Sequence, residues 1–185
     1  GITESYQAPK KMMDRLTEDK DKLFREFLKY ENDMNYEWFR KYFEDEHSDR
    51  KVKKQDFTPR GISEIVAKIT GTGDFYYEVA AGTGSMLIQA WSEQCIREGI
   101  FTYDPREHWF QVEELSDRAI PFLIFNMAIR GMNGVVLHGD SLTREFKEIY
   151  FIRNDTNDYL AFSEIIKMPK IKELEKFLDI RKWRS

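Results

Sequence analysis

The stretch DFYYEVAAGTGS, residues 74–85, contains the change of pattern that decides the fold. Its first half, Asp74–Val79, is rich in aromatic side chains and predicts a short β-strand. Ala80–Gly84 then predicts a tight turn, because its two glycines permit positive φ angles and let a ligand approach the backbone closely. Ser85–Arg97 places apolar residues on one face at helical spacing. A helix that starts directly after such a turn offers unpaired N–H groups to an anion.

The alternation of strand and helix continues toward the C-terminus. Trp109–Leu115 predicts a second strand, and Ser116 is expected to cap a helix that runs to Ile129 and stops at Gly131. Gly134–His138 predicts a third strand. Strands that alternate with helices of about 12 residues are typical of βαβ units, so we expect a parallel sheet.

The last part of the chain breaks this alternation. Ile149–Arg153 and Tyr159–Ile166 both predict strands, and Asn154–Asp158 between them is typical of a hairpin turn. Pro169–Leu178 predicts a short terminal helix. We therefore expect the sheet to be closed by a β-hairpin and a helix.

Two segments with helical periodicity precede the glycine turn. Lys10–Tyr30 predicts an amphipathic helix, and Asn35–Phe43 repeats its pattern. The polar stretch Glu44–Gln55 is the best linker candidate, and a further helix is expected from Pro59 to Ile69. We therefore divide the chain into a helical extension, residues 1–54, and a ligand-binding domain, residues 55–185.

Length and composition exclude several classes of protein. A chain of 185 residues, 41% hydrophobic, fits one domain with a real core and not a disordered chain. No run approaches the ~20 apolar residues of a membrane span, and no signal peptide opens the sequence, so we expect a cytoplasmic protein without a membrane partner. The single cysteine excludes an intramolecular disulfide, and with three histidines no metal site is expected.

The net charge of −4 is unevenly spread. Residues 55–166 contain 9 basic and 17 acidic residues, a balance of −8, whereas residues 167–185 contain 7 basic and 3 acidic residues, a balance of +4. The acidic middle would repel a phosphate backbone. If nucleic acid binds, it would therefore contact the two ends of the chain. The expected role of the charged residues at these ends is, however, an ordinary solvated surface. The candidate contacts are Lys51, Lys53, Lys54, Arg181, Lys182 and Arg184.

Carboxylates stand where a nucleoside-binding sheet needs them. Glu113 and Glu114 end the second strand, where an acidic residue accepts hydrogen bonds from ribose hydroxyls. Asp140 follows the third strand, and Phe57 and Pro59 are placed to fold over the site. The turn lacks the spacing of the G-x-G-x-x-G and G-x-x-x-x-G-K-[ST] motifs, which argues against NAD and ATP. Each of these residues also has a simpler explanation, as part of an ordinary turn or as solvated surface.

Four ordered segments resemble the adenine-specific DNA methyltransferases, in the branch that contains the modification subunits of type I restriction systems. These segments are Gln55–Arg60 (QDFTPR), Ala80–Ser85 (AAGTGS), Val112–Leu115 (VEEL) with Ile124–Met127 (IFNM) and Gly131, and Gly139–Leu142 (GDSL). The resemblance implies a Rossmann-like α/β fold of the S-adenosylmethionine-dependent methyltransferases. We expect a truncated, mostly parallel sheet, N-terminal helices, and a C-terminal β-hairpin plus helix.

The resemblance also implies S-adenosylmethionine as the cofactor. Its methionine part would lie against the glycine turn and Thr58, its ribose near Glu114, and its adenine amine near Asp140. The implied cofactor-binding residues are Phe57, Thr58, Glu78, Ala80, Gly82, Gly84, Glu114 and Asp140. No metal is implied.

The sequence departs from the family pattern at two places. Glu78-Val79 stands where the family has Asp-Pro, so the carboxylate reaches one methylene further. The Asn/Asp/Ser-Pro-Pro-aromatic loop that holds the target adenine in these enzymes is missing, because the chain has no Pro-Pro pair. Asn154–Tyr159 occupies roughly its place and is expected to be a hairpin turn and not a base-holding loop. The 45 residues after Asp140 are expected to be too few for the remaining strands of a complete methyltransferase sheet and for a target-recognition region.

Three functions stay open, and no catalytic residue is identified. The first is an S-adenosylmethionine-binding, DNA-modifying protein that methylates weakly or only when another chain completes its site. The second is a non-catalytic interaction or regulatory module of a restriction-modification system. Both predict contact with DNA, directly or through a partner subunit, and a homo- or hetero-oligomer. The third, a small-molecule methyltransferase, has no positive support. If the protein is an interaction module, we expect Met12, Met13, Trp38 and Phe39 to contact a partner. Amphipathic patterns favour the alternative, in which these residues pack on the chain's own sheet.

Overall fold

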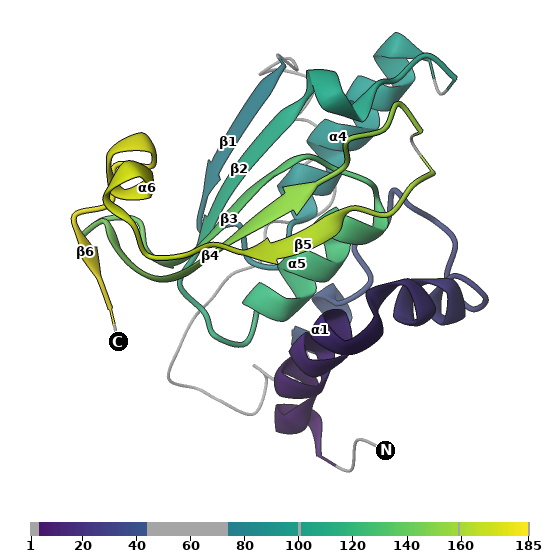
Figure 1. Ribbon diagram of the computed structural model, residues 1–185. Helices are drawn as coiled ribbons and strands as arrows, with labels where there is room; N and C mark the ends of the chain where they lie inside the picture. The colour runs from purple at the N-terminus through teal and green to yellow at the C-terminus, as the bar shows by residue number, and fades with distance from the viewer. Residues whose placement is uncertain (1–3, 44–73, 100, 159, 185) are drawn as a thin grey trace.

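The computed structural model describes residues 4–43, 74–99, 101–158 and 160–184, and it is built around a six-stranded sheet (Figure 1). The strand order is β1-β2-β3-β4-β5, with β6 paired to β4. The first three strands run parallel, β4 lies antiparallel between β3 and β5, and β6 runs parallel to β4. The strands are β1 (Phe75–Val79), β2 (Trp109–Glu114), β3 (Gly134–Asp140), β4 (Glu145–Arg153), β5 (Glu164–Lys167) and β6 (Lys182–Trp183).

The helices form layers on the sheet (Figure 1). Helices α4 and α5 lie against one face, α1 packs on the outer side of α5, and α6 lies on the other side of the sheet. The α-helices are α1 (Ala8–Phe27), α4 (Ser85–Glu98), α5 (Ile120–Ile129) and α6 (Lys172–Phe177), and two short 3-10 helices are η1 (Ser5–Gln7) and η2 (Pro105–Glu107). The mixed α/β fold with a mostly parallel sheet is confirmed, and it is compatible with a Rossmann-like methyltransferase fold.

Helix α5 is the centre of the core. All ten of its residues are buried, as expected for a helix that is apolar on every face. The sheet covers one side, and α1 with residues 34–43 covers the other. Aromatic rings surround Phe125 at centroid distances of 5.1 Å for Phe24, 5.0 Å for Phe27 and 5.2 Å for Phe39. The N-terminal part therefore covers the side of α5 that faces away from the sheet.

This packing decides between the two roles considered for the N-terminal apolar residues. Met12, Met13, Trp38 and Phe39 pack against the chain's own core cluster. Their assignment to a partner contact is therefore wrong, and the alternative of internal packing is confirmed.

Most predicted elements near the glycine turn are confirmed, including the three parallel strands, α4 and the β4–β5 hairpin. Two details are wrong. Ser116 does not cap α5, because the helix begins at Ile120, its N-cap position is Ala119 and no side chain caps it; the Ser116 carbonyl accepts the N–H groups of Ala119 and Ile120 in the preceding turn. Residues 35–39 are not helical, because their polar groups contact neighbouring elements and not a continuing helix.

Other boundaries differ by a few residues. Helix α1 contains a break at Asp19 (φ −160°, ψ 77°), β4 starts before the predicted Ile149, and α6 starts at Lys172 and not at Pro169. The linker Glu44–Gln55, the helix Pro59–Ile69 and the boundary between residues 54 and 55 lie outside the described residues, so the domain division stays a prediction. Of the described helices, none is both long and apolar enough to cross a bilayer.

Candidate cofactor site

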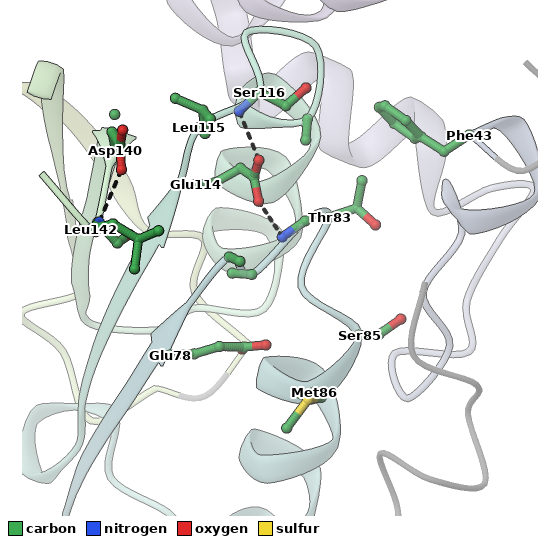
Figure 2. Close-up of a pocket in the computed structure, with 16 residues that line it drawn as sticks. Phe43, Glu78, Thr83, Ser85, Met86, Glu114, Leu115, Ser116, Asp140 and Leu142 are labelled. Carbon is green, nitrogen blue, oxygen red and sulfur yellow. Dashed lines mark hydrogen bonds between the residues drawn. The ribbon is translucent and has the colours of Figure 1, made fainter. Parts of the chain in front are cut away.

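A pocket of about 350 Å³ lies at the carboxyl ends of β1, β2 and β3, where open α/β sheets bind their ligands. Its volume is within the range of small-molecule sites. Five of the predicted cofactor residues line it together: Glu78, Ala80, Gly82, Glu114 and Asp140. Figure 2 shows Glu114 at its centre, with Asp140 on one side and Phe43 on the other.

The glycine turn has the backbone conformation that its sequence requires. Ala80, Gly82 and Gly84 all have positive φ angles, of 57°, 59° and 97°. Gly84 does not line the pocket; it is the residue before α4, and a side chain there would meet Leu123 at 3.1 Å. Gly84 therefore shapes the turn from behind, while Ala80 and Gly82 face the ligand space. A positive φ at Ala80 is uncommon for a residue other than glycine.

The Glu114 carboxylate joins the two loops that border the pocket. One oxygen, Oε2, accepts the Gly82 N–H at 2.7 Å, and Oε1 accepts the Ser116 N–H at 2.7 Å (Figure 2). A carboxylate has about four lone-pair sites, so acceptor capacity remains for a ligand hydroxyl. Glu114 thus fixes the turn and remains able to accept further hydrogen bonds.

The neighbouring Glu113 points to the opposite face of the sheet, because successive side chains of a strand alternate. It is 0% exposed and binds the Arg144 guanidinium through both oxygens at 2.7 Å. It also accepts the Tyr77 hydroxyl at 3.0 Å. Glu113 therefore has a structural partner and takes no part in the pocket.

Glu78 lies at the end of β1 with an unusual acidity. Burial raises the pKa of its carboxyl to about 7, and the nearby Glu114 charge acts in the same direction. The Tyr76 hydroxyl, which donates to Oε2 at 2.8 Å, and the Leu87 backbone N–H oppose this rise. Near neutral pH the carboxyl is thus close to the midpoint of its titration, and a ligand charge can shift it.

Asp140 is the last residue of β3 and remains ionised. The Thr143 and Leu142 N–H groups, donating to Oδ1 at 3.3 and 2.9 Å, lower its pKa, and the Arg184 charge adds to this. The Arg184 guanidinium lies 3.7 Å from Oδ2. No local sequence signal predicts this contact, because Arg184 follows the C-terminal strand β6 and lies 44 positions from Asp140.

The pocket also has walls that the sequence did not identify. Phe43 lines it with 2% exposure, packed on Phe122, and Met86, Leu115 and Leu142 add apolar surface. The aromatic spacing around Phe43 predicted burial but could not indicate which ring would reach the site. Phe57 and Thr58 lie outside the described residues.

Charge separates the ligands that this pocket suits from those it does not. Three carboxylates line it, and its described lining contains no Lys, Arg or His. The charged side chains that a phosphate would meet there are all negative, whereas ligand hydroxyls, amines and cations would meet acceptors. Among the described residues no cluster of His, Cys, Asp and Glu is arranged to hold a metal ion.

The hairpin loop lies far from this pocket. The Asn154 N–H donates to Asn133, and its side-chain amide donates to the Gly131 and Asp158 carbonyls. These partners lie at the amino end of β3, roughly 20 Å from its carboxyl end, the length of a seven-residue strand. The hairpin prediction is confirmed, and the described residues Asn154–Asp158 do not form a base-holding loop beside the pocket; Tyr159, the aromatic of that alternative, lies outside the described residues.

A family model described as N-6 DNA Methylase matches residues 32–177. The chain belongs to the N-6 DNA methylase family. The match covers β1 to β5 and every described residue that lines the pocket, and it confirms the resemblance to adenine-specific DNA methyltransferases. Comparisons with curated proteins and with solved structures gave no match. Membership supports a DNA methyltransferase-like function for this N-6 DNA methylase family member.

Proposed function

We propose that the protein binds S-adenosylmethionine in this pocket and takes part in adenine-specific DNA modification. The observation that carries the proposal is the set of three carboxylates around a glycine turn with no basic side chain in the described lining. S-adenosylmethionine carries a sulfonium and an ammonium group, and its ribose and adenine offer hydroxyl and amine donors. Both features suit an acidic, acceptor-rich pocket, whereas the phosphates of ATP or NAD do not.

Each proposed residue has a role that matches its chemistry. Glu114 would accept the ribose hydroxyls and Asp140 the adenine amine, while the turn at Ala80 and Gly82 would lie along the methionine part. Gly84 would hold the turn's shape, and Glu78 would face the cofactor's positive charge. Phe57 and Thr58 remain proposed contacts from outside the described residues. When bound, the cofactor supplies the methyl group for the adenine amino nitrogen.

Among the residues that the structure describes, no loop beside the pocket offers the groups that would hold the target adenine. The sequence has no Pro-Pro pair, and the hairpin loop lies at the wrong end of the sheet. The outer face of β1, the edge strand of the described sheet, exposes about half of Phe75, Tyr77 and Val79. Since parallel strands are normally covered on both faces, this supports methylation only when another chain completes the site.

A non-catalytic role in a restriction-modification system is the second candidate, and the missing adenine-holding motif is what favours it. In that role the protein would bind the cofactor or a partner subunit without transferring a methyl group. A cytoplasmic location and a homo- or hetero-oligomer belong to both candidates as proposals.

Calorimetric titration with S-adenosylmethionine tests cofactor binding directly. We expect saturable binding, and much weaker binding of ATP, whose phosphates would face the carboxylates. An absence of heat at millimolar S-adenosylmethionine would overturn the proposal. Transfer of a radiolabelled methyl group to DNA by the purified protein alone would then separate an independent enzyme from the two candidates that need a partner or lack catalysis.

A further inference from the structure

Residues 33–39, named here the clamp segment, connect the N-terminal part to both helices behind the pocket. The Met34 and Tyr36 carbonyls each accept a hydrogen bond from the Arg130 side chain at 2.8 Å. On the α4 side, Asn35 accepts hydrogen bonds from Gln89 at 3.0 Å and Ser92 at 2.8 Å. The segment is thus fixed between α4 and α5 by side chains that bind its polar groups.

Arg130, the residue directly after α5, binds the clamp segment on the α5 side. It is fully buried, donates to the Asn126 carbonyl and side chain at 2.9 Å each, and lies 4.3 Å from the Trp38 ring centre. Burial lowers its pKa to about 9, and the Glu37 and Asp33 charges oppose this. The guanidinium therefore stays charged at neutral pH.

One amide connects the clamp segment to the glycine turn. The Asn126 Nδ2 group donates to Glu37 Oε1 at 3.1 Å and to the Thr83 carbonyl at 2.8 Å. Thr83 lies between the two glycines of the turn and lines the pocket. Any movement of Glu37 would therefore reach the peptide group that borders the ligand space.

The same contact contains two buried polar atoms without a well-formed hydrogen bond. These are Glu37 Oε2 and the Thr83 hydroxyl. Burial raises the pKa of the Glu37 carboxyl, and the neighbouring Thr83 hydroxyl opposes this rise. Buried polar groups are rarely left incompletely paired. A small change in the turn would therefore be enough to bring the Thr83 hydroxyl and Glu37 Oε2 into a well-formed hydrogen bond.

We propose that Glu37 is a positioning residue for the cofactor, acting through Asn126 on the Thr83 peptide of the turn. This inference rests on the proposed function, because it takes S-adenosylmethionine as the ligand. A purely structural residue would stabilise the fold without affecting the turn. Glu37 instead orients the Thr83 carbonyl through Asn126, while Glu114 holds the neighbouring Gly82 N–H.

Glu37→Leu tests the proposal, because it keeps similar volume and removes both acceptor oxygens. We expect S-adenosylmethionine to bind about 5- to 10-fold more weakly, as for the loss of one buried hydrogen bond. We also expect faster amide hydrogen exchange at residues 82–86 without ligand. Glu37→Gln keeps an acceptor for Asn126 and gains a donor for the Thr83 hydroxyl, so it should restore both properties.

Ser92→Ala is the matched control, since it removes one hydrogen bond of the clamp segment to α4 while Gln89 and Arg130 still hold the segment in place. It should lower the melting temperature and leave affinity and turn exchange unchanged. If Glu37→Leu changes only the melting temperature, as this control does, the positioning role is wrong. Should Glu37→Leu not fold, Glu37→Asp withdraws the carboxyl by one methylene and should give the same two changes.

The two proposals fail in different ways. If the unaltered protein does not bind S-adenosylmethionine at millimolar concentration, the proposed function is wrong. Hydrogen exchange at residues 82–86 needs no ligand, so it still decides whether Glu37 orders the turn. Normal exchange in Glu37→Leu together with unchanged cofactor affinity would overturn the positioning role alone.

Discussion

Two adjacent carboxylates, Glu113 and Glu114, show how much a single position decides in this fold. They differ only in the face of β2 to which they point, and one is paired with Arg144 while the other joins the pocket loops. Sequence reasoning placed both at the correct strand end. The choice of Glu114 came from the family resemblance, and strand alternation supplies its physical reason.

Substitution of these two residues should affect two different properties, cofactor affinity for Glu114 and stability for Glu113. Glu114→Gln places an amide against two backbone N–H groups, so it should shift the turn and weaken S-adenosylmethionine binding by about 10-fold or more. Glu113→Gln breaks a buried ion pair and should lower the free energy of unfolding by ~3 kcal/mol with little change in affinity. Calorimetry and urea denaturation measure the two quantities. Equal affinity losses in both variants would contradict separate roles.

The acidity of Glu78 predicts a pH dependence of stability. Its folded-state pKa of about 7 lies above the ordinary value of 4.5, so between these values the folded state holds more of the proton. Ionisation of Glu78 therefore lowers the free energy of unfolding as pH rises from about 5 to 7. Glu78→Gln cannot ionise, so its melting temperature should rise relative to the unaltered protein over this range. A constant difference between the two from pH 5 to pH 8 would contradict the assignment.

At the scale of elements, the C-terminal strand β6 places Arg184, the residue that follows it, at the rim of the pocket. The Arg184 guanidinium binds Glu145 at 2.8 Å and lies 3.7 Å from Asp140 Oδ2. Both ion pairs are partly exposed, so each contributes no more than ~1 kcal/mol. If Asp140 accepts the adenine amine, Arg184 competes for the same carboxylate.

Removing this competition should strengthen cofactor binding. We expect Arg184→Ala to raise S-adenosylmethionine affinity about 2- to 3-fold at low salt, with a small loss of stability. Lys182→Ala is the control, since Lys182 lies 3.9 Å from Glu145 and makes no ion pair with Asp140 among the described contacts. Weaker binding in Arg184→Ala would instead mean that Arg184 holds Asp140 in place for the ligand.

The elements that sequence could predict are those specified by local signals. β1, the turn and α4 follow from aromatic spacing, two glycines and a helical stripe within residues 74–98. The clamp segment could not be found this way, because Arg130 and Gln89 bind its backbone carbonyls from distant helices. The predicted cap at Ser116 is wrong because a turn intervenes before the helix, which places Ala119 at the N-cap position.

At the scale of the whole molecule, charge and site coincide. The three pocket carboxylates belong to the segment with a balance of −8, and the basic C-terminal residues are partly neutralised by that same segment. Lys182 and Arg184 both face Glu145. These ion pairs weaken Lys182 and Arg184 as contacts for a phosphate backbone, and this limits how the C-terminal part can hold DNA.

This limit predicts the salt dependence of DNA binding. The affinity of a protein for duplex DNA falls with the logarithm of salt at a slope of about −0.9 per phosphate contacted. With Arg181 and Lys182 as the main candidates in the described C-terminal part, we expect a slope of about −2 to −3 between 50 and 200 mM salt. Fluorescence anisotropy with a labelled duplex measures it, and Arg181→Gln should reduce the slope by about one. A much steeper slope would reveal a larger basic surface, which Lys51, Lys53 and Lys54 could supply from outside the described residues. A steeper slope that a partner subunit produces, and that the protein alone lacks, would place the DNA contacts on that subunit.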